Sequence, residues 1–549
     1  MTTSNTGTPR SQRATWSVAL LALGAVALAL AALYQVSFYL RIPVDLLSFA
    51  ESPFLTDIIK YREGLPLYTP VADNNSYPYT PGTQILTYTI GAAFGHGTDI
   101  PFLRYVQFSY VLLAALVAGL VADGLSQLLI PEVRRGGRGL WIVSCTALLF
   151  LVALDPRFNN FVHSLHNDGL AMLISMTAAW LAVSHARGAR RWHLVAMAFL
   201  PALGFLVKQN QLMWAGLFAI YLWFEGSTDK RWVILWAVVA GILGVAVMGA
   251  AVLVLGENFR YWIFGALGDK QVSLARSILH LIWAGLYLTF GLLALVRFVL
   301  PGRSRGATAL WLMTGAMFAL TTYTSGLGWT ANHMGPAMML ATAWFLVVAR
   351  DAWPTPSSNG GWQALVAPAA AAAMVLALMG ALGVVRLPRN DVSPDLARYI
   401  ADVDKEFAGM NPDSVLLDNG SWPYLKAGIV MKDRSSPVTL HVTNNQSFIN
   451  RPALAETIQR IRERRYTRIL ARVIDTDQTP YDFHDRGSGV KAAILENYQI
   501  VRRIPGVAGV QTWWPLNLLS EVVVLEPRST STAPQSAAPD PSAPAPRSP

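Results

Sequence analysis

The chain has 549 residues, of which 53% are hydrophobic and only 14% are charged. Soluble domains typically carry roughly 25% charged residues, so this composition predicts a protein that is largely embedded in a membrane. The net charge of +10 does not indicate a nucleic-acid partner, because many Lys and Arg residues stand in short segments between apolar runs, where they orient a membrane protein. The single cysteine, Cys145, excludes an internal disulfide framework and a cysteine metal site.

The amino-terminal segment predicts a retained membrane anchor. Residues 1–15 are polar and contain Arg10 and Arg13, and a long apolar run follows from Trp16 to Leu40. This run exceeds the roughly 7–15 residues of a signal-peptide core, and it lacks a convincing cleavage site. We therefore expect residues 1–15 to be a cytoplasmic tail and the run after them to be the first membrane span.

Apolar runs recur as far as Val385 and predict a polytopic membrane domain over residues 16–385. A helix needs about 20 apolar residues to cross a hydrocarbon core about 30 Å thick, and shorter runs are tolerated where neighbouring helices cover them. About eleven membrane helices are expected, at 16–40, 102–130, 140–154, 168–184, 194–207, 211–224, 232–255, 279–300, 307–323, 333–349 and 363–385.

The distribution of Arg and Lys predicts which end of this bundle faces the cytoplasm, because cytoplasmic connections carry the basic excess. The basic residues that fall in alternate connections are Arg10, Arg13, Arg134, Arg135, Arg138, Arg187, Arg190, Arg191, Lys230, Arg231, Arg303 and Arg305. With an odd number of spans, the chain after Val385 emerges on the opposite, external face of the plasma (inner) membrane. The same face receives the connections that carry Asp45, Glu51, Asp168, Lys208 and His333. Any chemistry is therefore expected to be external.

Residues 386–527 change character and predict a small soluble α/β domain. Charges become frequent, and strand-like runs at 414–417, 468–473 and 521–525 alternate with helix-like stretches at 395–408 and 451–465. Residues 528–549 are rich in Pro, Ser and Ala and are expected to be disordered. The predicted fold class is an α-helical polytopic membrane protein with a C-terminal α/β domain.

The first external loop, residues 41–101, is long and combines acids with many tyrosines. It is too aromatic for disorder, so we expect a folded loop with short helices, one of them at 55–62, and an extended turn at Tyr77–Pro81. A carboxylate at the membrane surface can act as a general base on a hydroxyl, and Asp45 and Glu51 are the candidates. The alternative is that both are ordinary solvated loop acids.

Further polar groups interrupt apolar runs on the same face. Asp168 heads an apolar run, either as a functional acid or as a first-turn acid favoured by the helix dipole. Lys208 lies where the positive-inside rule disfavours a cation, so it can bind a phosphate, with help from Arg104 and Arg157; the alternative is a lysine that snorkels to water. His163 and His166 are spaced like metal ligands but lack a clear third ligand.

Several short motifs, in their order along the chain, resemble the membrane glycosyltransferases of the C-type fold that use polyprenyl-phosphate sugars. That family includes protein mannosyltransferases and bacterial lipid A aminoarabinose or galacturonic acid transferases. The motifs are Glu51-Ser52-Pro53-Phe54-Leu55, Glu63-Gly64-Leu65-Pro66-Leu67-Tyr68, Tyr77-Pro78-Tyr79-Thr80-Pro81, His166-Asn167-Asp168-Gly169-Leu170-Ala171, Lys208-Gln209 and Asn332-His333. The resemblance spans the membrane region. The segments 461–466 and 494–498 also resemble the trailing domain of some bacterial members.

The resemblance implies a catalytic base in the first loop, and the best positional match is Glu51. Many members place an Asp within a few residues of that acid, whereas Asp45 lies six positions before Glu51, so which of the two acts stays open. The catalytic candidates are Glu51, Asp45 and Asp168, and the donor-phosphate candidates are Lys208 and Arg157. The substrate-binding candidates are Tyr68, Tyr79, His166, Gln209, Asn332 and His333.

The expected reaction is inverting transfer of a sugar from a polyprenyl-phosphate donor to an external acceptor hydroxyl of a glycan, lipid or protein in the cell envelope. Phosphate is a competent leaving group, so no cofactor is required, although a divalent metal remains compatible with the chemistry. Membrane lipids are expected partners. A transporter or lipid flippase is the alternative, and it is disfavoured because transporters tend to place ionisable groups at the midplane and to show internal repeats. A scaffold that presents the soluble domain is a third reading.

Overall fold

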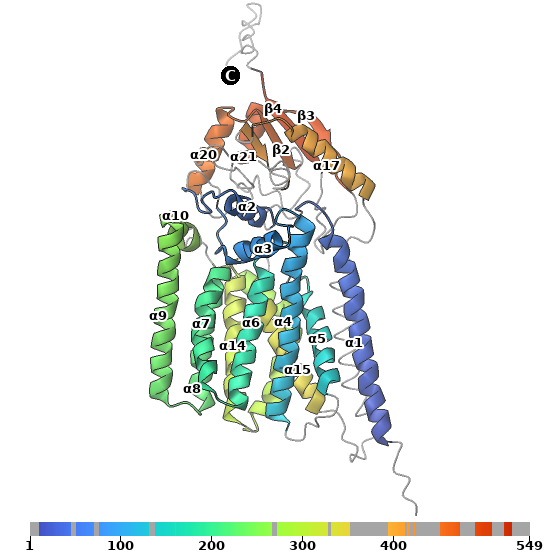
Figure 1. Ribbon diagram of the computed structural model, residues 1–549, viewed down its shortest axis with the longest axis vertical. Coiled ribbons are helices and arrows are strands. Elements are labelled where there is room, and N and C mark those ends of the chain that lie inside the picture. Colours follow the sequence, from blue (N-terminus) through green and yellow to red (C-terminus); the bar gives the residue numbers. More distant parts are fainter. Residues whose placement is uncertain are drawn as a thin grey trace, which may run out of the picture.

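The computed structural model describes two stacked parts, a helical bundle and a small sheet domain at one end of it (Figure 1). The described residues are 10–45, 51–70, 76–130, 138–159, 161–265, 272–302, 304–327, 331–351, 393–411, 414–417, 422, 451–472, 489–507 and 521–529. The predicted span at 363–385 lies outside these residues.

The bundle is built from apolar helices of 10 to 31 residues. They are α1 (Arg10–Leu40), α4 (Ile100–Leu129), α5 (Arg138–Ala153), α6 (Asp168–Arg187), α7 (Arg191–Val207), α8 (Met213–Glu225), α9 (Lys230–Leu255), α12 (Leu274–Trp283), α13 (Gly285–Ala294), α14 (Arg305–Ser325) and α15 (Gly335–Asp351). Among the described residues, four helices, α1, α4, α6 and α9, are long and apolar enough to cross a membrane alone. A fifth span results if α12 and the helix after it, which are bent by 67°, count as one.

Each of the first ten expected apolar runs is thus helical, and the protein is a multi-pass membrane protein. The count of eleven spans stays a prediction, because the last expected span lies outside the described residues. The observed helices begin and end within a few residues of the expected bounds, except that the run at 279–300 is broken at Ala284.

Small residues allow the central helices of the bundle to pack closely. α4 packs on α5, α6 and α15, and its buried face carries Ala114, Ala118 and Gly119. A Cβ on Gly119 would collide with Thr146 of α5. This is the small-residue packing that membrane helices use in place of hydrophobic driving force. The outward faces carry exposed Leu, Val and Ile side chains instead, most clearly on α9.

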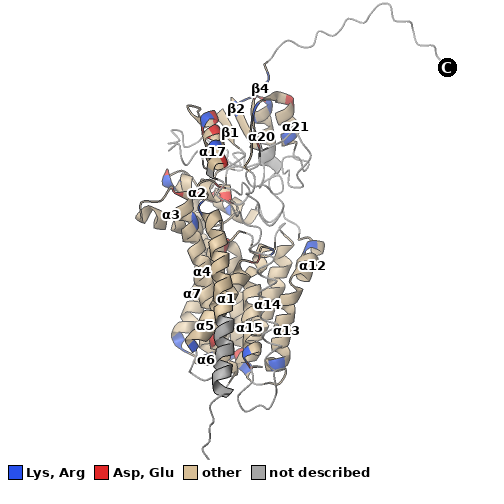
Figure 2. Cartoon of the chain, turned by 90° about the vertical axis from the view of Figure 1, so that its right-hand side faces the viewer, with Lys and Arg blue, Asp and Glu red and all other residues tan. Residues whose placement is uncertain are grey.

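The two ends of the bundle differ in charge (Figure 2). The end at which α4 stops and α5 starts, which we call the basic end, carries basic residues at the ends of several helices: Arg138, Arg187, Arg190, Arg191, Lys230, Arg231 and Arg305. The opposite end, which we call the domain end, lies beneath the sheet domain and receives the connection from α1 to α4 (Figure 1). The basic residues gather as the positive-inside rule predicts.

The first loop is folded over the domain end, as expected. It contains α2 (Glu51–Arg62), in which ten residues are buried, and α3 (Gly82–Ala93). Gly64, with a φ of 67°, allows the turn after α2. The Tyr77–Pro81 turn leads directly into α3, whose first residue, Gly82, lies so close to Leu206 of α7 that a Cβ would collide with its backbone.

The trailing domain contains a four-stranded sheet with the order β1-β2-β4-β3. β1 (Val415–Leu417) pairs parallel to β2 (Arg468–Arg472). β4 (Val522–Pro527) pairs antiparallel with β2 and with β3 (Tyr498–Ile504). Helices α17 (Ser393–Phe407), α20 (Arg451–Arg462) and α21 (Val490–Asn497) flank the sheet. The strand-like and helix-like runs are confirmed, whereas β3 was not predicted as a strand.

The sheet is buried on both faces, which explains the continuous apolar run of β4. Val523 and Leu525 face a cluster with α20 and α21, whereas Val522 and Val524 face α17 and the first loop. The second cluster is continuous with Phe54, Leu55 and Ile58 of α2 and with Tyr39 at the end of α1. The trailing domain is therefore docked on the first loop through a shared hydrophobic core.

Candidate functional site

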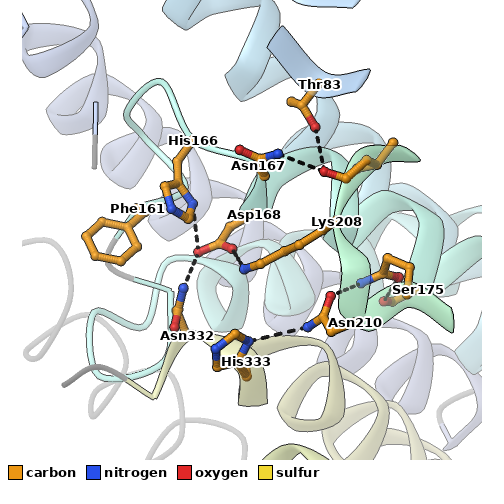
Figure 3. A network of polar contacts seen from close by, with 12 residues as sticks. Thr83, Phe161, His166, Asn167, Asp168, Ser175, Lys208, Asn210, Asn332 and His333 are labelled. Atoms are coloured by element: carbon orange, nitrogen blue, oxygen red, sulfur yellow. Dashed lines mark hydrogen bonds and ion pairs between the residues drawn. The ribbon is translucent and has the colours of Figure 1, made fainter. Parts of the chain in front are cut away.

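A buried ion pair between Asp168 and Lys208 lies at the domain end of the bundle. Asp168 is the first residue of α6, and Lys208 follows the last residue of α7, so two helix ends bring the groups together. Lys208 Nζ donates to Asp168 Oδ1 at 2.5 Å, and the two side chains are only 3% and 6% exposed. Asp168 Oδ2 accepts from Asn332 Nδ2 at 2.9 Å and lies 3.2 Å from His166 Nδ1 (Figure 3).

Lys208 keeps hydrogen-bonding capacity beyond this pair. A lysine ammonium has three N–H donors, and one of them is taken by Asp168. Nζ also lies 5.2 Å from the centre of the Tyr79 ring, a cation–π contact. Burial raises the pKa of Tyr79, so its hydroxyl stays neutral. Among the described residues, Lys208 has one hydrogen-bond acceptor for three donors, so it is suited to hold an anion.

The backbone around this pair is held by amide side chains. Asn167 Nδ2 donates to the carbonyl of Val207 at 2.7 Å and to that of Thr80 at 3.2 Å, which ties the start of α6 to the end of α7 and to the first loop. Gln209 Nε2 donates to the carbonyl of Pro78 at 2.7 Å. Each of these three hydrogen bonds joins segments far apart in sequence. Together they fix the backbone on either side of Lys208.

Other predicted substrate-binding residues border the same region. Tyr68 Oη donates to the carbonyl of Tyr79 at 2.6 Å, and His333 Nδ1 lies 3.3 Å from Asn210 Nδ2 (Figure 3). The structure thus brings together Asp168, Lys208, Tyr79, His166 and Asn332, with Tyr68, Gln209 and His333 around them.

Glu51 belongs to a second buried ion pair, with Arg104 of α4. Both side chains are fully buried. Arg104 Nε donates to Glu51 Oε1 at 2.7 Å and its Nη2 donates to Oε2 at 2.9 Å. The other guanidinium hydrogens go to the carbonyls of Tyr39, Ile42 and Val44, so all five donors are used. Glu51 Oε1 also accepts from the backbone N–H of Leu165 at 3.0 Å.

Asp45 lies where the first loop meets the trailing domain. Its Oδ1 accepts from the backbone N–H of Trp422 at 2.8 Å, and its Oδ2 accepts a short hydrogen bond from Ser52 Oγ. Both donors are neutral, unlike the guanidinium on Glu51. The side chain is 1% exposed. A substrate hydroxyl can therefore reach Asp45 only if the trailing domain moves aside or directs the substrate to it.

Arg157 is held apart from the Lys208 pair. Its Nε and Nη2 donate to the two oxygens of Asp155 at 3.0 and 2.6 Å, and Tyr287 Oη donates to Asp155 Oδ2 at 2.7 Å. Among the described residues, no contact joins Arg157 to Lys208 or Asp168.

The two predicted histidines are also separated. His163 packs edge-on against Tyr39 with ring centres 4.3 Å apart, and burial lowers its pKa to about 4. His166 faces Asp168 instead. Within the described ranges, no group of three or more His, Cys, Asp or Glu side chains is close enough to hold a metal ion.

Asp57 is a buried acid that sequence reasoning placed in the loop without assigning it a role. It lies within α2 and is 2% exposed, and its Oδ2 accepts from Gln84 Nε2 of α3 at 3.1 Å. Burial raises its pKa to about 7, although Lys60 and the Gln84 hydrogen bond lower it. The one sequence signal was the position of Asp57 among the apolar residues Leu55, Ile58 and Ile59.

Comparisons with known proteins identify the fold. No protein-family model matches the chain, and no curated protein matches it. The solved structure of ArnT from Cupriavidus metallidurans in the apo state superposes with a TM-score of 0.51 at 14% identity, over 92% of this chain and 98% of that chain. The same protein bound to undecaprenyl phosphate gives 0.53 at 12% identity, over 93% of this chain and 99% of that chain.

The Archaeoglobus fulgidus oligosaccharyltransferase tethered with an acceptor peptide gives a TM-score of 0.46 at 14% identity, over 92% of this chain and 76% of that chain, which is too low to define a fold. The two ArnT structures cover both the bundle and the trailing domain. The chain therefore has the C-type glycosyltransferase fold, as the motif resemblance led us to expect.

Proposed function

We propose that this protein is a membrane glycosyltransferase that moves a sugar from a polyprenyl-phosphate donor to an acceptor hydroxyl on the domain side of the membrane. The observation that carries the proposal is the buried Lys208 ammonium, which has donors to spare at the domain end of a C-type fold. ArnT, which shares the fold, has been captured with undecaprenyl phosphate.

In this proposal the donor phosphate binds at Lys208. A buried cation whose charge is only partly used by Asp168 attracts a phosphate strongly, because hydrogen bonds between ionised groups are among the strongest. Asp168, fixed by Asn332 and His166, keeps the ammonium pointed in one direction. The polyprenyl chain runs along apolar helix faces, which accounts for a transferase built within a membrane.

The transfer itself exchanges one bond at the anomeric carbon. The acceptor oxygen forms a bond to that carbon as the bond to the phosphate oxygen breaks, and the electron pair of the broken bond leaves with the phosphate. The acceptor proton goes to a carboxylate of the first loop. Lys208 stabilises the charge that grows on the departing phosphate. The anomeric configuration inverts because the acceptor attacks opposite the phosphate.

Asp45 suits the role of base better than Glu51. Both oxygens of Glu51 accept from the Arg104 guanidinium and one also accepts from an amide, so a proton transferred to Glu51 would disrupt a buried ion pair. Asp45 accepts hydrogen bonds from Ser52 Oγ and from the Trp422 N–H, two neutral donors that bind a carboxylate less strongly than the guanidinium binds Glu51. It also lies beside the trailing domain, which is positioned to guide an acceptor. We therefore assign Glu51 to positioning and Asp45 to proton transfer.

A transfer assay tests the proposal. The purified protein in lipid nanodiscs is supplied with a panel of radiolabelled polyprenyl-phosphate sugars and with envelope lipids, glycans or peptides as acceptors. Release of polyprenyl phosphate that depends on acceptor supports a transferase. Asp45→Asn is expected to lower the rate by about 10²–10⁴-fold, as for loss of a general base. The matched control is Glu63→Gln, which makes the same acid-to-amide change in the first loop at a residue that pairs with Arg62. Turnover equal to wild type in Asp45→Asn contradicts the assignment of the base.

No observation favours the transporter alternative. The buried carboxylates that form ion pairs in the described part of the bundle lie toward its two ends. Glu51, Asp155 and Asp168 lie at the domain end, and Asp123, which pairs with the half-exposed Arg138, lies at the basic end. A transport pathway is expected to place such groups near the midplane.

A further inference from the structure

A cavity of about 910 Å³ opens at the basic end of the bundle, far from the Lys208 site. It is lined by residues from the turn between α8 and α9 and from the start of α14. Its volume falls within the ~300–1,000 Å³ range of small-ligand sites. None of its described lining residues belongs to the site described above.

The described residues of its wall include two cations from separate helices. Lys230 begins α9 and Arg305 begins α14. Among the described residues, no ion pair is formed by either side chain. The acids near the cavity are engaged elsewhere. Glu225 accepts from Ser227 and Thr228 within the turn, and Asp229 caps the backbone of α9 by accepting from the N–H of Arg231.

Both cations are held in place by their surroundings. Lys230 Nζ lies 4.7 Å from the centre of the Trp223 ring, a cation–π contact. Arg305 lies across Gly226, where an added Cβ would be 3.1 Å from Cδ and 3.4 Å from Nη1. Gly226 therefore does two things: its φ of 82° ends α8, and its missing side chain leaves room for the guanidinium. Such fixed cations lose less side-chain freedom when they bind an anion.

The cavity opens at the boundary between polar and apolar surface. Next to its cations and hydroxyls, large apolar side chains are exposed, including Phe224 at 50%, Trp232 at 65% and Leu300 at 69%. Farther along α9, only 17% of the residues in its apolar stretch are buried inside the protein. A ligand that fits this surface has an anionic head and an apolar tail.

We propose that this cavity binds the head group of an anionic phospholipid in the leaflet opposite the Lys208 site. Lys230 and Arg305 pair with the phosphate, the hydroxyls of Ser227 and Thr228 accept hydrogen bonds from the head group, and the acyl chains lie along α9. Basic pockets between membrane helices commonly bind such lipids. The proposal does not depend on the transferase reaction, since the two sites lie at opposite ends of the bundle.

Lipid retention measured on the full-length protein tests it. The protein is purified in detergent with dioleoyl phosphatidylglycerol or dioleoyl phosphatidylcholine as the probe lipid, and bound lipid is counted by native mass spectrometry. We expect Lys230→Gln with Arg305→Gln to weaken phosphatidylglycerol binding about 30-fold, as for the loss of charge-assisted hydrogen bonds from two cations to one phosphate. The matched control, Arg191→Gln with Arg231→Gln, removes the same charge from the same end but leaves the cavity wall intact. It is expected to change binding less than about twofold, because salt screens exposed charges that do not contact the ligand.

Three results overturn the proposal. Equal losses in the two double variants mean that general charge attraction, not the cavity, holds the lipid. Unchanged binding in the cavity variant means that the lipid binds elsewhere. Displacement of the lipid by millimolar inorganic phosphate, with phosphate binding equally well without lipid, means that the site serves a free anion.

A charge-neutral variant tests the geometry. Gly226→Ala pushes Arg305 aside without removing it, so phosphatidylglycerol binding should fall while the net charge stays the same. A melting curve shows whether the variant is folded, and if it unfolds, Thr308→Leu fills the cavity from α14 instead and should have the same effect. Full binding by a folded variant with the cavity wall altered contradicts the proposed role of these residues.

Discussion

Two buried carboxylate–cation pairs at the domain end differ in how many N–H donors their cations keep for a further partner. Arg104 donates all five N–H groups, to Glu51 and to the carbonyls of Tyr39, Ile42 and Val44. Lys208 spends one of its donors on Asp168. A cation whose donors are all used holds protein together, whereas one with donors to spare can hold a ligand. In the proposed function, the first pair stabilises the structure and the second binds the donor phosphate.

We call Glu51–Arg104 the closed pair, because all the donors of its cation are used, and Asp168–Lys208 the open pair. The largest expected effect is a loss of stability when the closed pair is broken. Arg104→Met removes the guanidinium that pairs with the buried Glu51 and donates to three carbonyls. Loss of one partner of a buried pair costs about 3–5 kcal/mol, so the melting temperature of the purified protein should fall sharply. Arg41→Gln, an exposed arginine at the same end, is the control. A melting temperature of Arg104→Met close to that of wild type would show that the closed pair does not hold the first loop.

Breaking the open pair should instead affect turnover. Lys208→Gln keeps a donor for Asp168, which also retains Asn332 and His166, so the protein should remain folded. Loss of the cation that faces the departing phosphate is expected to lower turnover about 10²–10³-fold. Lys208→Arg, which keeps the charge, should recover part of the rate. If Lys208→Gln lowers stability as much as Arg104→Met does, the contrast between the two pairs fails.

A smaller effect is expected where the trailing domain meets the first loop. Trp422→Pro removes the N–H that bonds to Asp45, and Trp422→Phe keeps that N–H with a similar ring. A hydrogen bond to a charged group contributes about 1.5–3 kcal/mol, so the proline variant should lose roughly tenfold or more in turnover relative to the phenylalanine variant. Equal rates in the two variants would mean that the domain does not position Asp45 through this bond.

The smallest effect concerns Asp57. Its pKa of about 7 in the folded protein lies above the ordinary value of 3.8, because burial disfavours the charge. The folded state therefore binds a proton that the unfolded chain has already lost, so stability falls as the pH rises from about 4 through 7. Between pH 6 and pH 8 the loss should be about 1 kcal/mol. The melting temperature of Asp57→Asn should not share this pH dependence, and a parallel slope in the variant would refute the shift.

Much of the fold follows from the sequence for physical reasons. Apolar runs long enough to cross a bilayer have few alternatives to helix, because no backbone group can stay unpaired in lipid. The basic connections gather at one end of the bundle, since Arg138 and Lys230 begin α5 and α9 and Arg187 ends α6; that this end faces the cytoplasm stays a prediction. The break at Ala284 and strand β3 were missed, because tertiary packing rather than local pattern decides both.

The sequence indicated candidate polar residues but not the partners that they contact. Asp168, Lys208 and Asn332 were each predicted as site residues, and Asp168 contacts the other two; their functional roles stay predictions. That Arg104 closes on Glu51, fifty-three positions away, could not be read from the sequence, since its side chain simply interrupts an apolar run. Arg157 was expected near the phosphate, but an acid two positions before it, Asp155, holds it instead.

The most direct test of the contrast is the affinity for undecaprenyl phosphate, measured by native mass spectrometry on wild type, Lys208→Gln and Glu51→Gln. The open pair predicts binding at least about tenfold weaker in Lys208→Gln, with Glu51→Gln close to wild type as long as it is folded. Wild-type affinity in Lys208→Gln would contradict the claim that this lysine holds the donor phosphate.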